Sequence, residues 1–160
     1  MTVMKTTHDR TSGDNVVVFL LGMRLNKVWR VDAWLPVFVG QYRMLKELSR
    51  DPDSGLLGYR TVFGKDGGTS IQYWRDTESL YAYAADMAQL HRPAQKAFFR
   101  RERNAVAAVG IWHETYEVAA SETIYGDMPP IGLAKALGQV PITKDTMRAR
   151  QRLGSQEFNR

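Results

Sequence analysis

The sequence contains no cysteine among its 160 residues. Disulfide bonds, thiolate nucleophiles and cysteine-ligated metal ions are therefore excluded. Histidine is also scarce, with only His8, His91 and His113 present. A histidine-based metal site needs further ligands, and no third ligand lies at a usable spacing from His91 and His113. We therefore expect no metal ion.

The sequence also lacks a long apolar run. The apolar stretch at residues 16–23 is far shorter than the roughly 20 residues that cross a bilayer as a helix. The first 15 residues are polar and have no apolar core of the kind found in signal peptides. We therefore expect a soluble, cytoplasmic protein with no membrane partner.

The net charge of +5 does not indicate a nucleic-acid partner. Basic residues gather at residues 100–103 and in the last 17 residues of the chain, 144–160. Neither cluster has the interleaved aromatic residues or the motif of a nucleic-acid-binding module. We expect both clusters to be solvated, and no nucleic acid to bind.

Hydrophobic periodicity and turn residues predict four strands and two helices. The expected strands cover residues 15–25, 56–63, 69–75 and 109–118, and the expected helices cover 32–50 and 76–105. Residues 64–68, Gly-Lys-Asp-Gly-Gly, are a strong hairpin signal between the second and third strands. Pro93 is expected to kink or restart the second helix.

The order β-α-β-β-α-β predicts a ferredoxin-like α+β domain, with a four-stranded antiparallel sheet and both helices on one face. We divide the chain into a flexible N-terminal arm (1–14), this domain (15–122), a segment that packs on the domain or on a partner (123–142) and a basic flexible tail (143–160). Both faces of the first strand are apolar, so the face away from the helices needs a cover. A second copy would supply it, and we expect a homodimer that closes a barrel.

Strand 109–118, Val-Gly-Ile-Trp-His-Glu-Thr-Tyr-Glu-Val, places titratable groups in an apolar run. Successive side chains of a strand point to opposite faces. His113 and Glu114 therefore belong to different faces and form no simple dyad unless a bulge intervenes. Trp112 and Tyr116 share the face of Glu114. One of the two faces is expected to line a cavity.

Three stretches carry a resemblance to a known family. They are Val16 to Leu25 with the Trp34-bearing helix, His91-Arg-Pro-Ala-Gln-Lys-Ala-Phe98, and Val109-Gly-Ile-Trp-His-Glu-Thr-Tyr116 with Ile124-Tyr-Gly-Asp-Met-Pro-Pro-Ile-Gly-Leu133 downstream. Together they span about residues 15–135. This part of the chain resembles the dimeric α/β-barrel superfamily, and within it the monooxygenase-like family that includes the fumagillin-pathway ABM-type enzyme.

The resemblance implies a small homodimer that oxygenates an electron-rich molecule, aromatic or polyketide-like, without metal or flavin. Relatives with the same barrel bind haem, among them aldoxime dehydratases and chlorite dismutases, and others have no demonstrated activity. Three functions therefore stay open: a cofactor-independent monooxygenase, a haem protein, and a non-enzymatic dimer that binds a small molecule.

His113 is our candidate for the general base, which would deprotonate the substrate so that the carbanion reduces dioxygen. Glu114 is its rival as the catalytic residue. His91 is expected on a cavity wall, and His113 or His91 would be the axial ligand in the haem alternative. The remaining residues expected at the substrate are Tyr73, Trp74, Trp112, Tyr116, Arg24 and Arg75. The aromatic residues would equally serve a core or dimer interface, and the arginines would equally form surface ion pairs.

Overall fold

A computed structural model describes residues 5–12, 16–65, 67–85 and 107–153. Its main sheet has four antiparallel strands in the order β3-β4-β2-β5. These strands are β2 (Val16–Leu25), β3 (Leu56–Gly64), β4 (Gly67–Trp74) and β5 (Val109–Val118). The central position of β2 between β4 and β5 is the ferredoxin-like arrangement, so the predicted fold class is confirmed.

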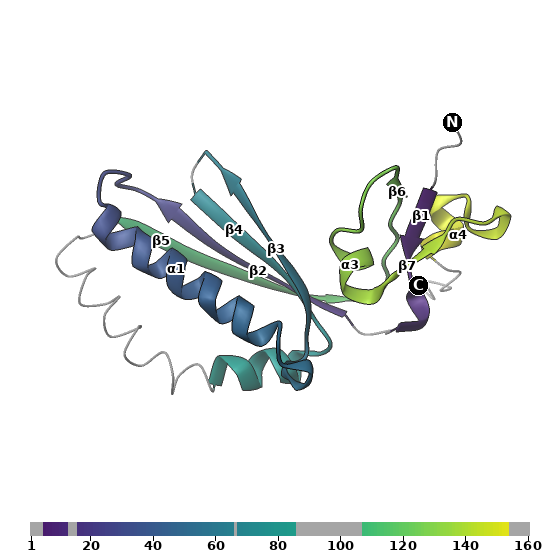
Figure 1. Ribbon diagram of the computed structural model, residues 1–160, viewed down its shortest axis with the longest axis horizontal. Helices are drawn as coiled ribbons and strands as arrows, with labels where there is room; N and C mark the ends of the chain where they lie inside the picture. Colours follow the sequence, from purple (N-terminus) through teal and green to yellow (C-terminus); the bar gives the residue numbers. More distant parts are fainter. Residues whose placement is uncertain (1–4, 13–15, 66, 86–106, 154–160) are drawn as a thin grey trace, which may run out of the picture.

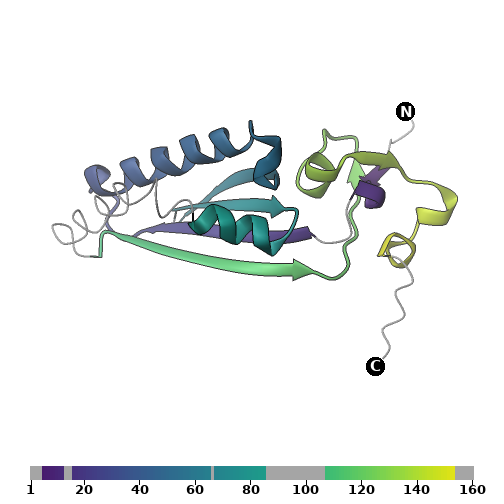
Figure 2. The same ribbon diagram turned by 90° about the horizontal axis from the view of Figure 1, so that it is seen from below.

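Helix α1 (Val31–Leu48) and a helical segment at residues 77–85 cover one face of this sheet. Figures 1 and 2 show α1 running along that face. Asp32 lies in the first turn of α1, where its carboxylate pairs with Arg30. Within the described residues, no helix is both long and apolar enough to span a membrane.

The core between the sheet and the helices has two parts. One gathers Met23, Val109 and Ala33, with Phe38 packed against them. The other gathers Val17, Leu80 and the fully buried Trp74. Both parts use odd-numbered residues of β2, so this strand turns its odd-numbered side chains toward the helices.

A smaller lobe stands beyond the start of β2 and the end of β5 (Figure 1). Its sheet has the order β6-β1-β7 and is built from β1 (Lys5–His8), β6 (Tyr125–Gly126) and β7 (Gln139–Pro141). Around it lie the short elements η1 (Arg10–Ser12), α3 (Leu133–Leu137), η3 (Lys144–Thr146) and α4 (Ala149–Leu153); the remaining turn, η2 (Pro52–Ser54), precedes β3.

This lobe differs from two sequence-based expectations. Residues 5–8 were expected in a flexible arm, but β1 is the central strand of the small sheet, and Thr6, Thr7 and His8 are buried. Residues 143–153 were expected in a flexible tail, but they form η3 and α4. The first expectation failed because a strand this short gains its stability from partners more than 100 residues away in the sequence, which local patterns do not reveal. The second failed because α4 is held by contacts with distant segments: Arg152 donates to Glu122, and Arg10 donates to the Arg152 carbonyl.

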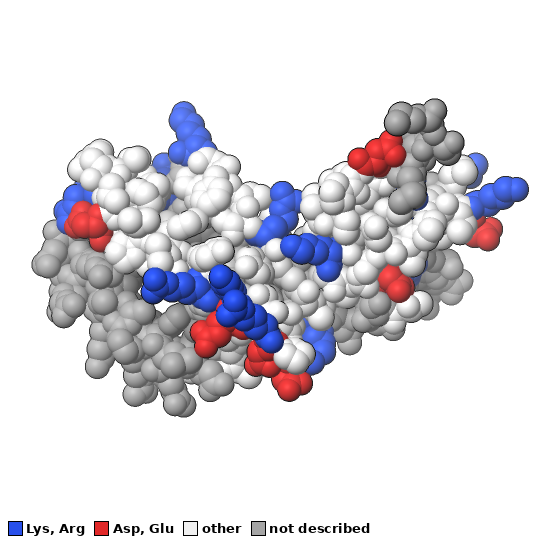
Figure 3. All heavy atoms as spheres, in the orientation of Figure 1, with Lys and Arg blue, Asp and Glu red and all other residues white. Residues whose placement is uncertain are grey.

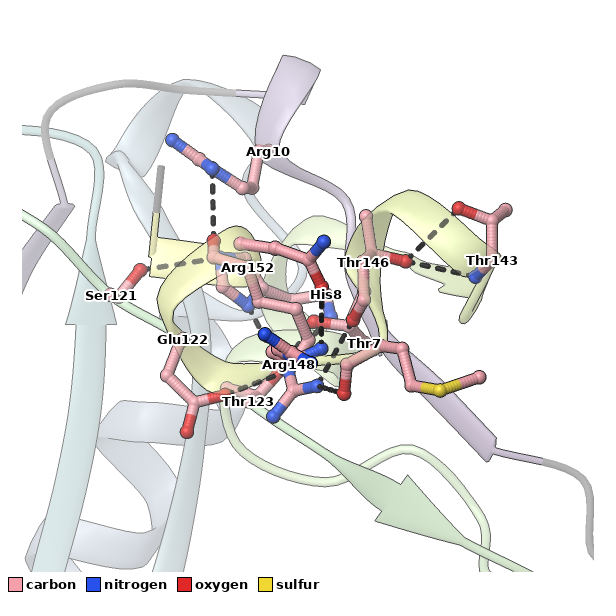
Figure 4. Close-up of polar contacts among 12 residues, drawn as sticks. Thr7, His8, Arg10, Ser121, Glu122, Thr123, Thr143, Thr146, Arg148 and Arg152 are labelled. Atoms are coloured by element: carbon pink, nitrogen blue, oxygen red, sulfur yellow. Dashed lines mark hydrogen bonds and ion pairs between the residues drawn. The ribbon is translucent and has the colours of Figure 1, made fainter. Parts of the chain in front are cut away.

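Polar contacts in the lobe join its first and last segments (Figure 4). The His8 ring lies 2.9 Å from Thr123 Oγ1 through Nδ1 and 3.2 Å from Ser121 Oγ through Nε2. The buried Arg152 guanidinium donates to Glu122 Oε2 at 2.8 Å and to the carbonyl groups of Thr146 and Met147. These contacts explain why residues at the two ends of the chain are buried together.

Candidate functional site

Strand pairing sorts the predicted site residues onto the two faces of the main sheet. His113 lies directly opposite Leu21 of β2, and Glu114 lies directly opposite Leu20. Residues directly opposite each other share a face. His113 therefore lies on the helix-covered face, as odd-numbered β2 residues do, and Glu114 lies on the open face. The two candidate catalytic residues cannot act as one site within one chain.

A buried polar ladder runs along β4 on the helix-covered face. Trp74 Nε1 donates to Gln72 Oε1 at 3.1 Å, and Gln72 Nε2 donates to Ser70 Oγ at 3.3 Å. All three residues are at most 2% exposed. Polar groups are costly to bury unless they are hydrogen-bonded, and here each satisfies the next. The ladder therefore fixes donors and acceptors inside an otherwise apolar layer.

His113 lies on the same sheet face as this ladder, but on the edge strand β5, where it is exposed. Its ring centroid lies 5.8 Å from that of Phe19. Ser70 and His113 both lie opposite Leu21, one on each neighbouring strand. Two strand spacings separate their backbones, roughly 10 Å. On this face Leu21 therefore lies between His113 and the ladder.

Tyr83 adds a hydroxyl group to this layer. The centroid of its ring lies 5.3 Å from that of the Trp74 ring. Its buried Oη has no hydrogen-bond partner in the part of the chain that the structure describes. Burial raises the pKa of Tyr83 well above its ordinary value, and Glu47 adds to the effect. Tyr83 therefore keeps its proton at neutral pH and can donate it in a hydrogen bond.

The open face carries a second polar pair. Tyr116 Oη donates to Glu114 Oε2 at 2.7 Å, and this hydrogen bond raises the pKa of Tyr116. Trp112 lies on the same face and covers Gly22 of β2. Tyr73 also belongs to this face, because it lies opposite Val18. Burial raises the pKa of Tyr73, with a smaller contribution from Tyr125.

The structure thus divides the predicted substrate-binding aromatics. Trp74 lies with His113, whereas Tyr73, Trp112 and Tyr116 lie with Glu114 on the open face. His91 lies outside the described residues. The interleaved numbering of the two sets along the same strands is the reason that sequence reasoning placed them together.

The two predicted arginines lie at strand ends. Arg75 follows β4 and makes local contacts, donating to Asp76 Oδ2 and to Ser79 Oγ at 3.2 Å each. Hydrogen bonds from Ser79 lower the pKa of Asp76, and Arg75 contributes further. Arg75 therefore stabilises the turn into the second helix. Arg24 is exposed on the open face, opposite Gly67 and Gly110.

Sequence reasoning missed Ser70 and Gln72. The signal was present, because polar residues at 70 and 72 alternate with Ile71 and Tyr73 in a strand flanked on both sides by other strands. His8, which lies in the segment expected to be a flexible arm, is buried in the structure. Among the residues that the structure describes, no three His, Asp or Glu side chains gather as a metal site would require.

Comparisons with solved structures give partial matches at low identity. MupZ from Pseudomonas fluorescens is 14% identical, with a TM-score of 0.41, over 62% of this chain and 69% of that chain. A conserved protein of unknown function from Bacteroides thetaiotaomicron is 15% identical, with a TM-score of 0.40, over 66% of this chain and 100% of its own. SnoaB, a cofactor-independent oxygenase from Streptomyces nogalater, is 14% identical, with a TM-score of 0.36, over 65% of this chain and 92% of its own.

No curated protein sequence matches this chain. The sequence profile of the monooxygenase af470-like family, in contrast, matches residues 16–133, which include all four strands of the main sheet and both candidate catalytic residues. This chain therefore belongs to the monooxygenase af470-like family.

Proposed function

We propose that this protein is a cofactor-independent monooxygenase of a small aromatic or polyketide-like molecule, with His113 as the base. The observation that carries the proposal is the buried ladder of Trp74, Gln72 and Ser70 on the sheet face of His113. A core alone has no need of this chain of polar groups. Membership of a family named for a monooxygenase supports the general reaction class.

The reaction needs one base and a way to stabilise the resulting anion. His113 removes a proton from a carbon that a neighbouring carbonyl and aromatic rings make acidic. The carbanion transfers electrons to dioxygen, a carbon–oxygen bond forms, and the histidinium returns the proton to the peroxide. Loss of water then leaves a carbonyl. One oxygen atom enters the product, the other leaves as water, and the substrate supplies the electrons.

The ladder would hold the substrate oxygen on which negative charge develops. Tyr83 and the amide of Gln72 are the donors of this layer, and fixed donors aimed at developing charge are the largest single source of rate enhancement in many enzymes. Trp74 orients the amide of Gln72 through its own N–H group. In this scheme Gln72 and Trp74 position the substrate and His113 performs the proton transfer.

A homodimer would leave this layer intact and cover the open face. Val18, Leu20 and Ile71 share that face with Trp112 and Tyr116, which are 40% and 51% exposed. An apolar sheet face of this extent is uncommon on a monomer. Glu114 and Tyr116 would then be interface residues rather than catalytic ones.

Oxygen consumption with dithranol tests the assignment of the base. This dihydroxyanthrone has a methylene group acidified by a carbonyl group and two aromatic rings. After subtraction of the uncatalysed rate, we expect His113→Ala to lower the enzymatic rate by about two to four orders of magnitude and Glu114→Gln to retain most of it. Loss of activity in Glu114→Gln alone would move the site to the open face. Binding of dithranol to the wild-type protein without oxygen consumption would favour the non-enzymatic alternative.

The strands around His113 supply no cation for the haem alternative. Haem propionates are commonly held by cations, and strands β2–β5 place no lysine or arginine on the face of His113. The other candidate ligand, His91, lies outside the described residues. A Soret band on addition of haem, abolished in a His113→Ala variant, would favour the haem alternative.

A further inference from the structure

The turn between β2 and α1 displays two apolar side chains at its apex. The Arg30 N–H group donates to the Lys27 carbonyl at 3.0 Å, which closes a turn whose central residues are Val28 and Trp29. Val28 is 60% exposed and Trp29 is 75% exposed. The central positions of turns favour Gly, Asn, Asp and Pro. The sequence Lys-Val-Trp-Arg is therefore not explained by turn formation.

Hydrogen bonds on both sides hold this turn in place. The N–H groups of Asn26 and Lys27 donate to the Ala108 carbonyl at 3.0 and 3.2 Å. The Trp34 indole donates to the Val28 carbonyl at 3.0 Å. The backbone is therefore anchored to the domain, and the Val28 and Trp29 side chains project outward from a fixed support.

Apolar surface continues from the turn onto neighbouring elements. Val31 and Leu35, four residues apart on α1, are 45% and 42% exposed. Phe63, near the end of β3, is 70% exposed. The centroid of its ring lies 5.4 Å from that of Phe38 of α1. Figure 3 shows uncharged atoms over this end of the main domain, bordered by charged side chains. An exposed apolar region of this kind marks an interaction surface.

The chain around the turn is basic. Residues 24–32 contain three Lys or Arg and one Asp, which gives 3 − 1 = +2. One acidic residue, Asp32, is already paired with Arg30 at 2.8 Å. The apolar apex is therefore bracketed by cations and suits a negatively charged partner.

We infer that this end of the domain binds an anionic lipid surface, with Trp29 and Val28 inserted at the boundary of the headgroups. A lipid layer accepts a protruding side chain without a preformed pocket, which a protein partner would have to supply. Tryptophan favours this boundary, and basic residues beside it attract anionic lipids. The expectation of no membrane partner was based on the lack of a spanning segment, and surface binding requires none.

Co-sedimentation of the full-length protein with vesicles tests this inference. We expect binding to phosphatidylcholine vesicles that contain phosphatidylglycerol, weaker binding to phosphatidylcholine alone, and release as salt is raised. Trp29→Ala should lower the partition constant about tenfold, because burial of a large aromatic side chain is lost. Tyr81→Ala is the matched control. Tyr81 is 61% exposed in the helix that follows β4, at the other end of the sheet, and its replacement should leave binding unchanged.

Three results would overturn the inference. The wild-type protein could remain in the supernatant with both kinds of vesicle, or Trp29→Ala could bind as well as the wild type. A change of oligomeric state in Trp29→Ala, measured by light scattering after gel filtration, would instead assign this surface to a second copy of the chain. Because Trp29 is mostly exposed, unfolding of the variant is not expected, and circular dichroism verifies that it is folded.

Discussion

The indole ring of Trp112 lies directly over Gly22 of the neighbouring strand, on the open face of the main sheet. The two residues are opposite each other in the pairing of β2 with β5, and a side-chain carbon on Gly22 would overlap the indole. Aromatic side chains commonly cover strand glycines in this way. The close approach explains a glycine in the middle of a mostly apolar strand.

Gly22→Ala should therefore destabilise the protein by about 1–3 kcal/mol, because the indole must leave its position. Urea unfolding followed by circular dichroism measures the change. Gly40→Ala is the matched control. Gly40 is exposed on α1 with nothing near its missing side chain, so alanine should increase helix stability by up to about 1 kcal/mol. Equal effects of the two substitutions would contradict the close packing at Gly22.

The ladder on β4 makes a prediction about coupling. Trp74→Phe leaves Gln72 Oε1 without its donor, and Gln72→Leu leaves Trp74 Nε1 without its acceptor. Each single substitution should cost about 1–3 kcal/mol, because a buried polar group loses its partner. The double variant should be less destabilised than the sum of the two, as determined by a double-mutant cycle of unfolding free energies. Simple additivity would show that the two groups do not interact.

The contacts of Arg152 are expected to stabilise the small lobe. Its guanidinium donates to Glu122 and to two carbonyl groups and is only 5% exposed. Arg152→Ala should destabilise the lobe by about 3–5 kcal/mol, because Glu122 then loses the cation of a largely buried ion pair. Hydrogen exchange should then accelerate in β1 and β7 before it does in β2 to β5. Arg150→Ala, on the exposed side of the same short helix, should leave exchange unchanged.

The burial of His8 is expected to make the folding stability of the protein depend on pH. Burial lowers the pKa of His8 below its ordinary value of 6.5, with a further contribution from Arg10, while Asp9 and Glu122 oppose the shift. The unfolded chain therefore binds more protons than the folded chain just below pH 6.5. Stability should be highest above that pH and should fall as the pH is lowered toward the folded-state pKa.

Urea midpoints measured between about pH 7.5 and 5.5 would reveal this loss, since carboxylates titrate at lower pH. His8→Asn should flatten the profile over the same range. It should also lower stability at neutral pH, because the contacts of the ring with Thr123 and Ser121 are reduced. A wild-type profile in the variant would assign the pH dependence to other groups.

The sequence by itself determined the main domain. Apolar periodicity located β2 to β5 and α1 to within about two residues, and the order of the elements gave the sheet topology. It also placed His113 and Glu114 on opposite faces, because side-chain alternation in a strand is a local property. These features follow from residues close together in the chain, where propensity and pattern act.

Only the tertiary structure decided which face of the main sheet the helices cover. It also decided how residues 5–12 and 119–153 pack into the small lobe. The alternation of β2 is apolar on both faces, so no local signal shows that its odd-numbered residues meet the helices. The partnership of Trp74 with Gln72 likewise depends on burial by elements distant in the sequence. The pairing of β1 with β6 and β7, and the burial of His8 and Arg152, arise from contacts across nearly the whole chain, which only folding brings together.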